Sequence, residues 1–556
     1  MIWSVRSSIS FRTRIPDAYR SFGPSSSSKG WYSTMTVAHD YLNDVVWRAR
    51  KPMEPLEHHV AWEDRPRAQK FYPETSSIDL HQWSAPSVPA SSSDSALSIG
   101  EFSGMLLGSY AMVDRRLTVY ANSDVDSLPE YWSAAWSRGA ASGGARYPVS
   151  IYWVVGPGCD LLPGVYFYSP DQHCLRLLLS GDVTDQVAAA LGRPESVRDQ
   201  YLLLGIKFWQ NSYKYNSFAY HAVSMDTGTA LESFRFYLGD GANRLEPRFW
   251  FDEAAIAELL NVDPLRDEAV FCVVEIGGAT RRTRLADNQA LPSSRVPFAD
   301  KEFSTKVTYF EVLLELQSTM GVSPGESPDA VAVSRAVASR YKGTGILIPL
   351  PQPSPLLKDS AEVLTARRSS FGRFSSARSM EPTDLAYLLS EGALAGLLNC
   401  DVLLPTAENN PLELFVFVNH VSGVAPGAYR YDQAAGALEQ INRGVDDGFL
   451  QRNYFLENYN PEQAGAVIVP AIRTKAFLDE IGPRGYRVAN TIIGMATQRI
   501  YEAATSIDVG CGAALGFDNV SYMERLEIDG GDLVPLIMMM VGSERPGSAA
   551  YRYEIL

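Results

Sequence analysis

The sequence predicts an α+β protein made of two similar domains joined end to end, because the chain contains an internal repeat. The stretch RYPVSIYWVVGPGCDLLPGVYFYSP at 146–170 has a partner in NPLELFVFVNHVSGVAPGAYRYDQ at 410–433. Four matches keep one offset (411 − 148 = 263): Pro148 with Pro411, Gly164 with Gly427, Tyr166 with Tyr429, and Tyr168 with Tyr431. Each copy therefore reads as a β-rich alternating run after a proline, a Pro-Gly turn and a second short strand.

Two further pairs of segments extend the repeat. The helical pattern FAYHAVSMDTGTALESFRFYL aligns with RGYRVANTIIGMATQRIYEAA, which places Tyr220 on Tyr486 and Gly228 on Gly494. The closing apolar strands AVFCVVEIGG and LVPLIMMMVG also correspond. We therefore expect one domain at 35–280 and a second at 307–556, with a linker at 281–306 and a flexible loop at 85–98.

Composition and charge narrow the class of protein. A chain of 556 residues exceeds what one hydrophobic core usually organises. The net charge of -15 argues against a nucleic-acid partner, whose binding proteins are normally basic. The five cysteines lack CxxC spacing, so we expect neither disulfides nor a zinc site, and we expect a cytoplasmic location. The longest strongly apolar run, LVPLIMMMVG, is far shorter than the roughly 20 residues that span a bilayer, so no membrane partner is predicted.

The first 34 residues differ from the rest of the chain. They are rich in Ser and Arg and nearly free of acids, which is similar to an organellar transit peptide. We favour instead a disordered arm or an over-long start, with Met35 as the natural beginning.

The order of motifs in the repeat resembles the flavin-dependent nitroreductase-like fold, and more narrowly the SagB-type azoline dehydrogenases of thiazole and oxazole peptide biosynthesis. That order is an RRS loop before a helix, a small-residue loop, a Pro-led strand, a Pro-Gly-x-Tyr turn, a long helix and a terminal apolar strand ending in Gly. HDYLNDVVW with EDRPRAQKFYPE looks like the N-terminal lead-in of these enzymes. ASGGARYP is similar to their Pro-Ser-x-Gly-x-x-Pro loop, and YKYNSFAYHAVSMDTG to their Lys-Tyr motif.

The resemblance implies one FMN at the junction of two fused subunits. Such folds are normally homodimers in which FMN draws on both subunits, so here the two repeats would form an intramolecular pseudodimer. The second repeat has an arginine loop that the first lacks near 85–93, and the first has SGGARYP where the second has TAENNPL. The two partial sets would complement each other into one complete site.

The resemblance also assigns cofactor ligands. Arg367, Arg368 and Ser369 would hold the FMN phosphate, because guanidinium groups bind phosphate oxygens in bidentate geometry; a solvated surface loop is the alternative. The Ser/Gly loop at Ser142, Gly143 and Gly144 would come from the other repeat. Gly510 and Gly512 would lie in a loop past the isoalloxazine ring, unless they form only a helix C-cap turn. Arg545 would be a second phosphate-side cation or an exposed tail charge, and Arg373 is left unassigned.

Lys214 and Tyr215 are the catalytic candidates. On the residues alone, a lysine in the aromatic segment NSYKYNSFAY could be a base made neutral by burial or an ordinary lysine on a strand edge. The resemblance favours the base. It implies that Lys214 removes the ring proton alpha to the carbonyl of a peptide thiazoline or oxazoline, while the neighbouring methylene releases hydride to flavin and Tyr215 orients or shares the proton.

Two other functions compete with azoline dehydrogenation. One is a general nitro or quinone reductase, and the other is a peptide-binding scaffold pseudoenzyme. The implied partners of the dehydrogenase are an azoline-containing precursor peptide and the cyclodehydratase of the same pathway. The adjacent His58 and His59 would point to opposite faces of a strand, so no metal site is predicted.

Overall fold

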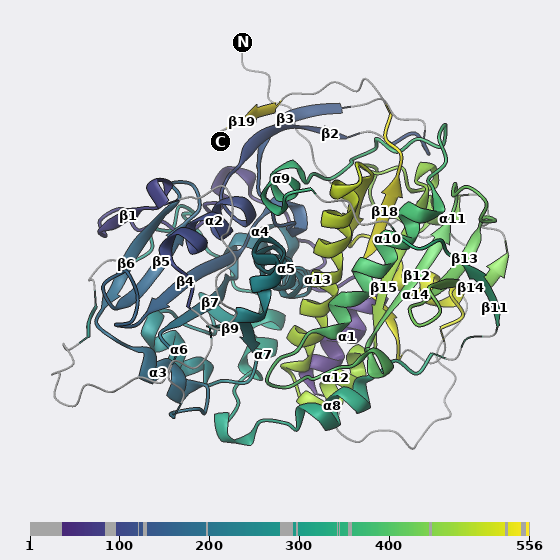
Figure 1. Cartoon of the computed structure of the whole chain (residues 1–556). Helices are drawn as coiled ribbons and strands as arrows, with labels where there is room; N and C mark the ends of the chain where they lie inside the picture. Colours follow the sequence, from purple (N-terminus) through teal and green to yellow (C-terminus); the bar gives the residue numbers. More distant parts are fainter. Residues whose placement is uncertain are drawn as a thin grey trace, which may run out of the picture.

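The computed structural model shows two antiparallel sheets of similar size on either side of a central pair of helices (Figure 1). It describes residues 36–83, 96–120, 122–125, 130–195, 198–277, 293–295, 299–341, 343, 345–353, 358–443, 448–528, 532–545 and 552–554. The predicted N-terminal arm at 1–34 lies outside the described residues. So do most of the predicted loop at 85–98 and most of the predicted linker at 281–306.

The first sheet has the strand order β1-β6-β5-β4-β7-β9-β8, with β10 also paired to β6. Its strands are β1 (Ser77–Asp79), β4 (Val149–Val155), β5 (Gly164–Ser169), β6 (Cys174–Ser180), β7 (Gln200–Lys207), β8 (Leu245–Arg248), β9 (Glu268–Ile276) and β10 (Ser294–Arg295). The central strands β4, β7 and β9 are buried along their whole length. Both of their faces are covered, which explains their nearly continuous apolar sequences.

The second sheet repeats this order as β11-β14-β13-β12-β15-β18-β16, with β17 paired to β15. Its strands are β11 (Ile346–Pro349), β12 (Leu412–Val418), β13 (Gly427–Asp432), β14 (Ala437–Arg443), β15 (Ala466–Ile472), β16 (Gly510–Ala514), β17 (Val534–Pro535) and β18 (Met538–Gly542). β12, β13 and β14 have the bounds of β4, β5 and β6 shifted by the predicted offset (412 − 149 = 263). The two halves therefore share one topology, and the tandem α+β prediction is confirmed.

The long helices α5 (Ala219–Leu238) and α13 (Gly485–Ser506) join the halves. They lie side by side in the centre of the molecule (Figure 1). A Cβ atom on Gly228 would stand 2.1 Å from the Thr491 carbonyl oxygen, and one on Gly494 would stand 2.0 Å from the Met225 carbonyl oxygen. Only glycine allows two helix backbones to approach so closely at this crossing.

Shorter helices cover the outer faces and the seam. α2 (Ile99–Ser109) packs on α5, and α10 (Pro382–Ala393) packs on α13. The remaining α-helices are α1 (Val37–Trp47), α3 (Thr184–Ala190), α4 (Trp209–Tyr215), α6 (Glu253–Leu260), α7 (Glu311–Ser318), α8 (Ala330–Val337), α9 (Ser360–Ala366), α11 (Phe449–Arg452), α12 (Thr474–Ile481) and α14 (Asn519–Arg525). One large apolar core runs through both halves, and a smaller one lies between the first sheet and helices α3 and α6.

Each half also lends elements to the other. Helix α1 belongs to the first half in sequence but packs against α12 and α14 of the second. The C-terminal strand β19 (Arg552–Glu554) pairs with β2 (Asp114–Tyr120), which in turn pairs with β3 (Glu130–Ser137). In the described part of the chain, no helix has the length and apolar character needed to cross a bilayer.

Candidate active site

The Ser/Gly loop between β3 and β4 is the centre of the candidate site. It turns sharply, because Gly144, Ala145 and Tyr147 all have positive φ angles, of 61°, 54° and 49°. Left-handed backbone is costly for residues other than glycine and persists where the surroundings over-determine it. Asn216, directly after the Lys-Tyr pair, has a φ of 43°. Backbone strain thus gathers where the sequence places the catalytic candidates.

Helix α4 brings Lys214 and Tyr215 against this loop. Both side chains are half-buried, and the Lys214 Nζ atom lies 4.7 Å from the centroid of the Tyr215 ring. A Cβ atom on Gly144 would stand 2.0 Å from the Tyr215 hydroxyl and 2.9 Å from the Lys214 Nζ atom. The Lys-Tyr pair therefore contacts the loop where glycine leaves room for it. The pair lies on a helix, so the alternative of a lysine on a strand edge is wrong.

Asp226 on α5 holds the Ser/Gly loop through hydrogen bonds. Its carboxylate accepts hydrogen bonds from the Ser142 hydroxyl at 2.8 Å and from the Gly143 backbone N–H at 2.9 Å. The Ser142 oxygen in turn accepts from the Tyr147 N–H at 2.8 Å. Asp226 is only 4% exposed, and this burial raises its pKa to about 7. Desolvation disfavours the charged form of a carboxyl group, which is the physical cause of the increase.

The second half reaches the same loop through Arg367. The side chain is 5% exposed; Nε donates to the Gly139 carbonyl at 2.5 Å, and Nη2 donates to the carbonyls of Arg138 at 2.9 Å and Ala140 at 3.2 Å. Its guanidinium lies 5.1 Å from the ring of Tyr501 on α13. Most of its donors therefore bind backbone carbonyls, so Arg367 staples the arginine loop to the start of the Ser/Gly loop.

Gln498 on α13 makes a second link across the seam. Its side-chain oxygen accepts from the Ala141 N–H at 2.8 Å, and its nitrogen donates to the Gly139 carbonyl at 3.2 Å and to Glu502 at 2.8 Å. Burial raises the pKa of the Glu502 carboxyl group well above its ordinary value. The loops that the sequence assigned to opposite repeats thus meet in the structure.

Ser369 and Ser370 attach the arginine loop to β16. The Ser369 hydroxyl lies 2.9 Å from the Tyr501 hydroxyl, which accepts from the Ala513 N–H at 2.8 Å. Ser370 pairs with Cys511 through its backbone N–H, at 2.8 Å from the Cys511 carbonyl, and through its hydroxyl, which accepts from the Cys511 N–H at 3.0 Å. These contacts set the arginine loop beside the strand that carries Gly510 and Gly512.

Gly510 and Gly512 belong to the strand β16 and not to a loop or a helix cap, so the expected backbone conformation was wrong. The tract is an extended segment paired with β18, because its small residues fit a closely packed edge of the sheet. A Cβ atom on Gly512 would stand 2.3 Å from the Tyr459 ring. Tyr459 also stacks on Phe371, with ring centroids 4.8 Å apart. An aromatic pair therefore covers the face of Gly512.

Arg368 in the arginine loop and Arg545 after β18 are exposed cations. The Arg368 side chain is 49% exposed and forms an ion pair with Glu544. Arg545 is exposed, and its backbone N–H donates to the Arg373 carbonyl at 2.8 Å. These two guanidinium groups, unlike Arg367, remain accessible to an anion.

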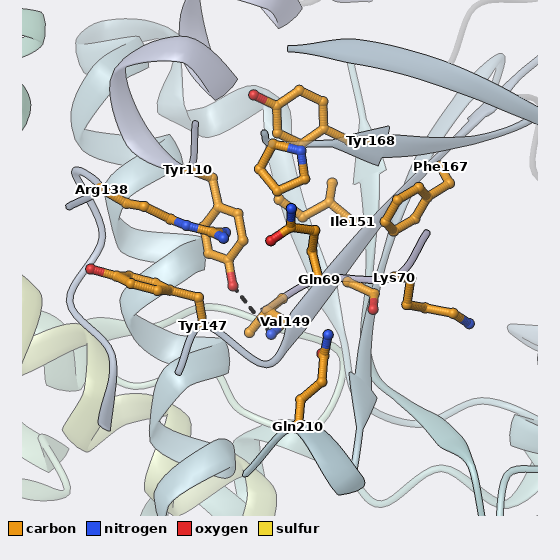
Figure 2. A pocket seen from close by; sticks show the side chains of 12 residues that line it. Gln69, Lys70, Tyr110, Arg138, Tyr147, Val149, Ile151, Phe167, Tyr168 and Gln210 are labelled. Carbon is orange, nitrogen blue, oxygen red and sulfur yellow. Dashed lines mark hydrogen bonds between the residues drawn. The ribbon is translucent and has the colours of Figure 1, made fainter. Parts of the chain in front are cut away.

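A small cavity of about 10 Å³ lies behind the Ser/Gly loop (Figure 2). Arg138 borders it, with its guanidinium 4.8 Å from the Tyr110 ring centroid and 4.4 Å from that of Tyr147. The Arg138 Nη1 atom and the Gln69 Oε1 atom are buried there without a hydrogen-bond partner among the described residues. A cavity of this size is close to that of a single water molecule, which could bond both atoms.

Several of these groups were not found by sequence reasoning. None of Asp226, Arg138, Gln498, Tyr459 and Glu544 belongs to a motif, and the contacts of Asp226, Gln498 and Glu544 with the two loops join distant parts of the sequence. Asp226 had one available signal, because the aligned position in the second helix is Ile492 (492 − 226 = 266, the offset of Gly228 and Gly494). An acid in one repeat and an apolar residue in the other marks a position used in only one half.

Comparison with known proteins identifies the class. Residues 364–543 match the model of the nitroreductase family, so the chain contains a nitroreductase-family domain in its second half. A solved structure from Anabaena variabilis, described as a nitroreductase, superposes along its whole length on 92% of this chain, with 20% identity and a TM-score of 0.69. The likeness extends across both halves, so the nitroreductase-like fold is that of the tandem chain.

Two other solved structures overlap with smaller parts of the chain. The Escherichia coli microcin synthetase McbBCD complex with truncated pro-MccB17 covers 39% of this chain and 88% of its own matched chain, at 18% identity and a TM-score of 0.28. A nitroreductase from Exiguobacterium sibiricum in complex with FMN covers 36% of this chain and 95% of its own, at 10% identity and a TM-score of 0.24. No curated protein matches the sequence.

Members of the nitroreductase family bind FMN. The donor set at the seam fits the phosphate of this cofactor, because the exposed cation Arg368 neighbours Ser369 in the arginine loop, and the exposed Arg545 joins the same loop through its backbone bond to Arg373. The Tyr459 ring now fills the space against Gly512, so a flat ring can reach that glycine only if Tyr459 moves. Among the described residues, no group of three His, Cys, Asp or Glu side chains could hold a metal ion.

Proposed function

We propose that this protein is an FMN-dependent dehydrogenase that oxidises peptide thiazolines or oxazolines to thiazoles or oxazoles. The observation that carries the proposal is the contact of Lys214 and Tyr215 with Gly144, in a loop that Arg367 holds from the other half. A general nitro or quinone reductase has no need of a proton acceptor placed beside the Ser/Gly loop. The Lys-Tyr segment also resembles the Lys-Tyr motif of the azoline dehydrogenases, which favours that function over a nitro or quinone reductase.

In this proposal, both halves hold the cofactor. Arg368, Arg545 and Ser369 bind the phosphate, and the Ser/Gly loop lines the opposite side. Arg367 acts on the cofactor site indirectly, because its hydrogen bonds position the backbone at 138–140. FMN, when bound, supplies a hydride acceptor for the carbon next to the one that loses its proton.

Lys214 removes the proton alpha to the carbonyl of the azoline ring. Its amine must be neutral to accept a proton, and the Lys214 Nζ atom lies 4.7 Å from the centroid of the Tyr215 ring. Tyr215 holds its hydroxyl against Gly144, where it can donate a hydrogen bond to the substrate or to the Lys214 nitrogen. Loss of this proton to the lysine, together with one hydride that bound FMN would accept, leaves the aromatic azole.

The proposed partners are an azoline-containing precursor peptide and the cyclodehydratase that makes the azoline. Aromatic side chains near the Lys-Tyr pair provide a surface for a peptide. Trp62 is 41% exposed and meets the Tyr213 ring edge-on, with ring centroids 6.0 Å apart. Arg146 donates a hydrogen bond to the Tyr213 hydroxyl on the same side.

Lys214→Ala tests the catalytic assignment. The variant is expected to stay folded and to keep bound FMN, but to oxidise a thiazoline peptide about 10² to 10⁴ times more slowly, as expected for loss of a general base. Tyr215→Phe keeps the ring and loses only the hydroxyl, so its loss of rate is expected to be smaller. Dithionite reduction and air reoxidation of the flavin serve as the control, because neither needs the substrate proton removed. If the Lys214→Ala protein oxidised the thiazoline peptide at the wild-type rate, the catalytic assignment would be wrong.

A scaffold without redox activity is the second candidate, and the Tyr459 ring favours it. That ring covers Gly512 and stacks on Phe371. Arg367 donates its hydrogen bonds to protein carbonyls. Tyr459→Ala would uncover Gly512. Flavin binding by the wild type supports the enzyme, whereas a colourless wild type that takes up FMN only after Tyr459→Ala supports the scaffold.

A further inference from the structure

The buried Asp226 and the partly buried Ser142 form a pair in which one proton decides where the serine hydroxyl points. The Ser142 oxygen accepts from the Tyr147 N–H at 2.8 Å and lies 2.8 Å from Asp226 Oδ2. An ionised carboxylate only accepts hydrogen bonds, so the Ser142 hydroxyl must then donate to it. A protonated carboxyl group can donate to Ser142 instead, and this frees the serine hydrogen for another acceptor.

We propose that Asp226 is a positioning residue that switches the Ser142 hydroxyl between an inward and an outward hydrogen bond, and so controls what the Ser/Gly loop offers to the cofactor. This inference rests on the proposed function, because it takes FMN as the acceptor. The oxygens of FMN are acceptors, so an outward hydroxyl strengthens binding and an inward one does not.

The surroundings of Asp226 make both states accessible near neutral pH. Its pKa is raised to about 7 by burial, against the opposing hydrogen bonds of Gly143 and Ser142. The Tyr110 hydroxyl is a nearby ionisable group, and it is neutral because burial raises its pKa. On the loop's other side lie Lys214 and Tyr215, which contact Gly144, and Arg146, whose Nε donates to the Gly144 carbonyl at 3.1 Å.

The second half lacks the pair of an acid and a serine, and its loop at 406–410 has no positive φ angle. Thr406 stands where the first half has Ser142 (406 − 142 = 264), but its hydroxyl bonds to Asn409 at 3.1 Å. Ile492 stands where the first half has Asp226. The acid and the left-handed turn of the Ser/Gly loop therefore occur together, in the first half and not at the equivalent loop of the second.

Asp226→Asn fixes the proposed outward state. An asparagine amide can donate to Ser142 through its nitrogen and accept from the Gly143 N–H through its oxygen, whatever the pH. The experiment measures the FMN dissociation constant from pH 5.5 to 8.5 for the wild type, Asp226→Asn, Ser142→Ala and the double variant. The FMN phosphate titrates near pH 6 in all four, so each ratio to the wild type removes that common effect.

The wild type and Asp226→Asn are expected to bind equally at pH 5.5. At pH 8.5 the wild type is expected to bind FMN about 2- to 10-fold more weakly than Asp226→Asn does, which corresponds to the loss of one neutral hydrogen bond. In the Ser142→Ala background, Asp226→Asn is expected to have no effect at any pH. The inference would be overturned if the ratio of the wild-type and Asp226→Asn dissociation constants did not change with pH. It would also be overturned if the same pH-dependent effect of Asp226→Asn persisted in the Ser142→Ala background.

Thermal unfolding of the protein without flavin gives a second readout. The raised pKa means that the neutral carboxyl group stabilises the fold fully below about pH 4, and this contribution is lost as pH rises through about 7. Asparagine does not ionise, so the melting temperature of Asp226→Asn relative to the wild type is expected to increase between pH 5 and pH 8.

Asp401→Asn is the matched control for neutralising a buried aspartate. Burial also raises the pKa of Asp401, which is partly exposed and accepts backbone hydrogen bonds from Phe249 and Trp250, each at 2.9 Å, away from the Ser/Gly loop. It is expected to leave the pH dependence of FMN binding unchanged. If none of the proteins binds FMN, the proposed function fails. The melting comparison still tests the protonation of Asp226, and a melting difference that is flat across pH would overturn it.

Discussion

Gly228 and Gly494 meet at the crossing of the two long helices, where the Gly228 Cα atom lies 3.1 Å from the Cβ position of Gly494. These glycines are also partners in the sequence repeat. A contact between equivalent residues is the mark of a two-fold axis, as in an isologous dimer interface. The chain therefore carries a pseudo-two-fold axis through this crossing.

Substitution at the crossing is expected to destabilise both halves together. A Cβ atom on Gly494 would press on the Met225 carbonyl oxygen, which is backbone and cannot swing aside. Gly494→Ala is expected to lower the free energy of unfolding by about 1–3 kcal/mol, as for overpacking in a core. Urea denaturation measures this. The control is Ser327→Ala, at an exposed turn position with ordinary backbone angles, which is expected to change stability little. Gly482→Ala would not serve as a control, because the positive φ of Gly482 makes alanine unfavourable there for a different reason.

The adjacent arginines are expected to respond differently to alanine. The sequence predicted that both hold the FMN phosphate, but Arg367 is buried and bonds three carbonyls. Arg367→Ala removes one donor from each of those carbonyls, and the Gly139 carbonyl keeps a second donor in Gln498, so we expect a loss of about 2–4 kcal/mol of stability. Arg368→Ala is expected to change stability by less than about 1 kcal/mol and to weaken FMN binding. Denaturant titration and flavin fluorescence separate the two effects, and equal behaviour of both variants would contradict the structure.

Glu544 is expected to compete with the FMN phosphate for Arg368. The carboxylate already pairs with this guanidinium, so an incoming phosphate must displace it. Glu544→Gln removes the negative charge and is expected to tighten FMN binding about 3- to 10-fold, in line with one charge interaction near a protein surface. Glu391→Gln is the control, because Glu391 pairs with Arg499 at 2.7 Å on another helix pair. Weaker binding by Glu544→Gln would show that Glu544 does not face the phosphate.

One FMN per chain is expected. The first half alone has the Asp226 acid and the Lys-Tyr pair, where the aligned positions of the second half are Ile492, Glu480 and Ile481. Only one of the two symmetric positions therefore has a full set of groups. Release of flavin by heat, followed by its absorbance relative to protein, measures the ratio, and two flavins per chain would contradict the expectation.

Sequence reasoning found the elements that repeat and missed the contacts that cross between repeats. The strand bounds of β4 to β6 recur in β12 to β14 because apolar alternation and the Pro-Gly turn are local signals. The staple from Arg367 to the carbonyls at 138–140 joins segments 228 positions apart, and no local pattern encodes it. The strand at Gly510 and Gly512 was expected as a loop, because small residues give a weak strand signal until a neighbouring strand is known.

The interlocking of the halves changes what one substitution can do. Helix α1 packs on the opposite half, and β19 returns to β2, so neither half is a separable unit. In a homodimer every substitution appears twice, and damage to one cofactor position damages its twin. In a covalent pair held at high effective concentration, the two positions vary independently. One position can then change its contacts while the other keeps its own.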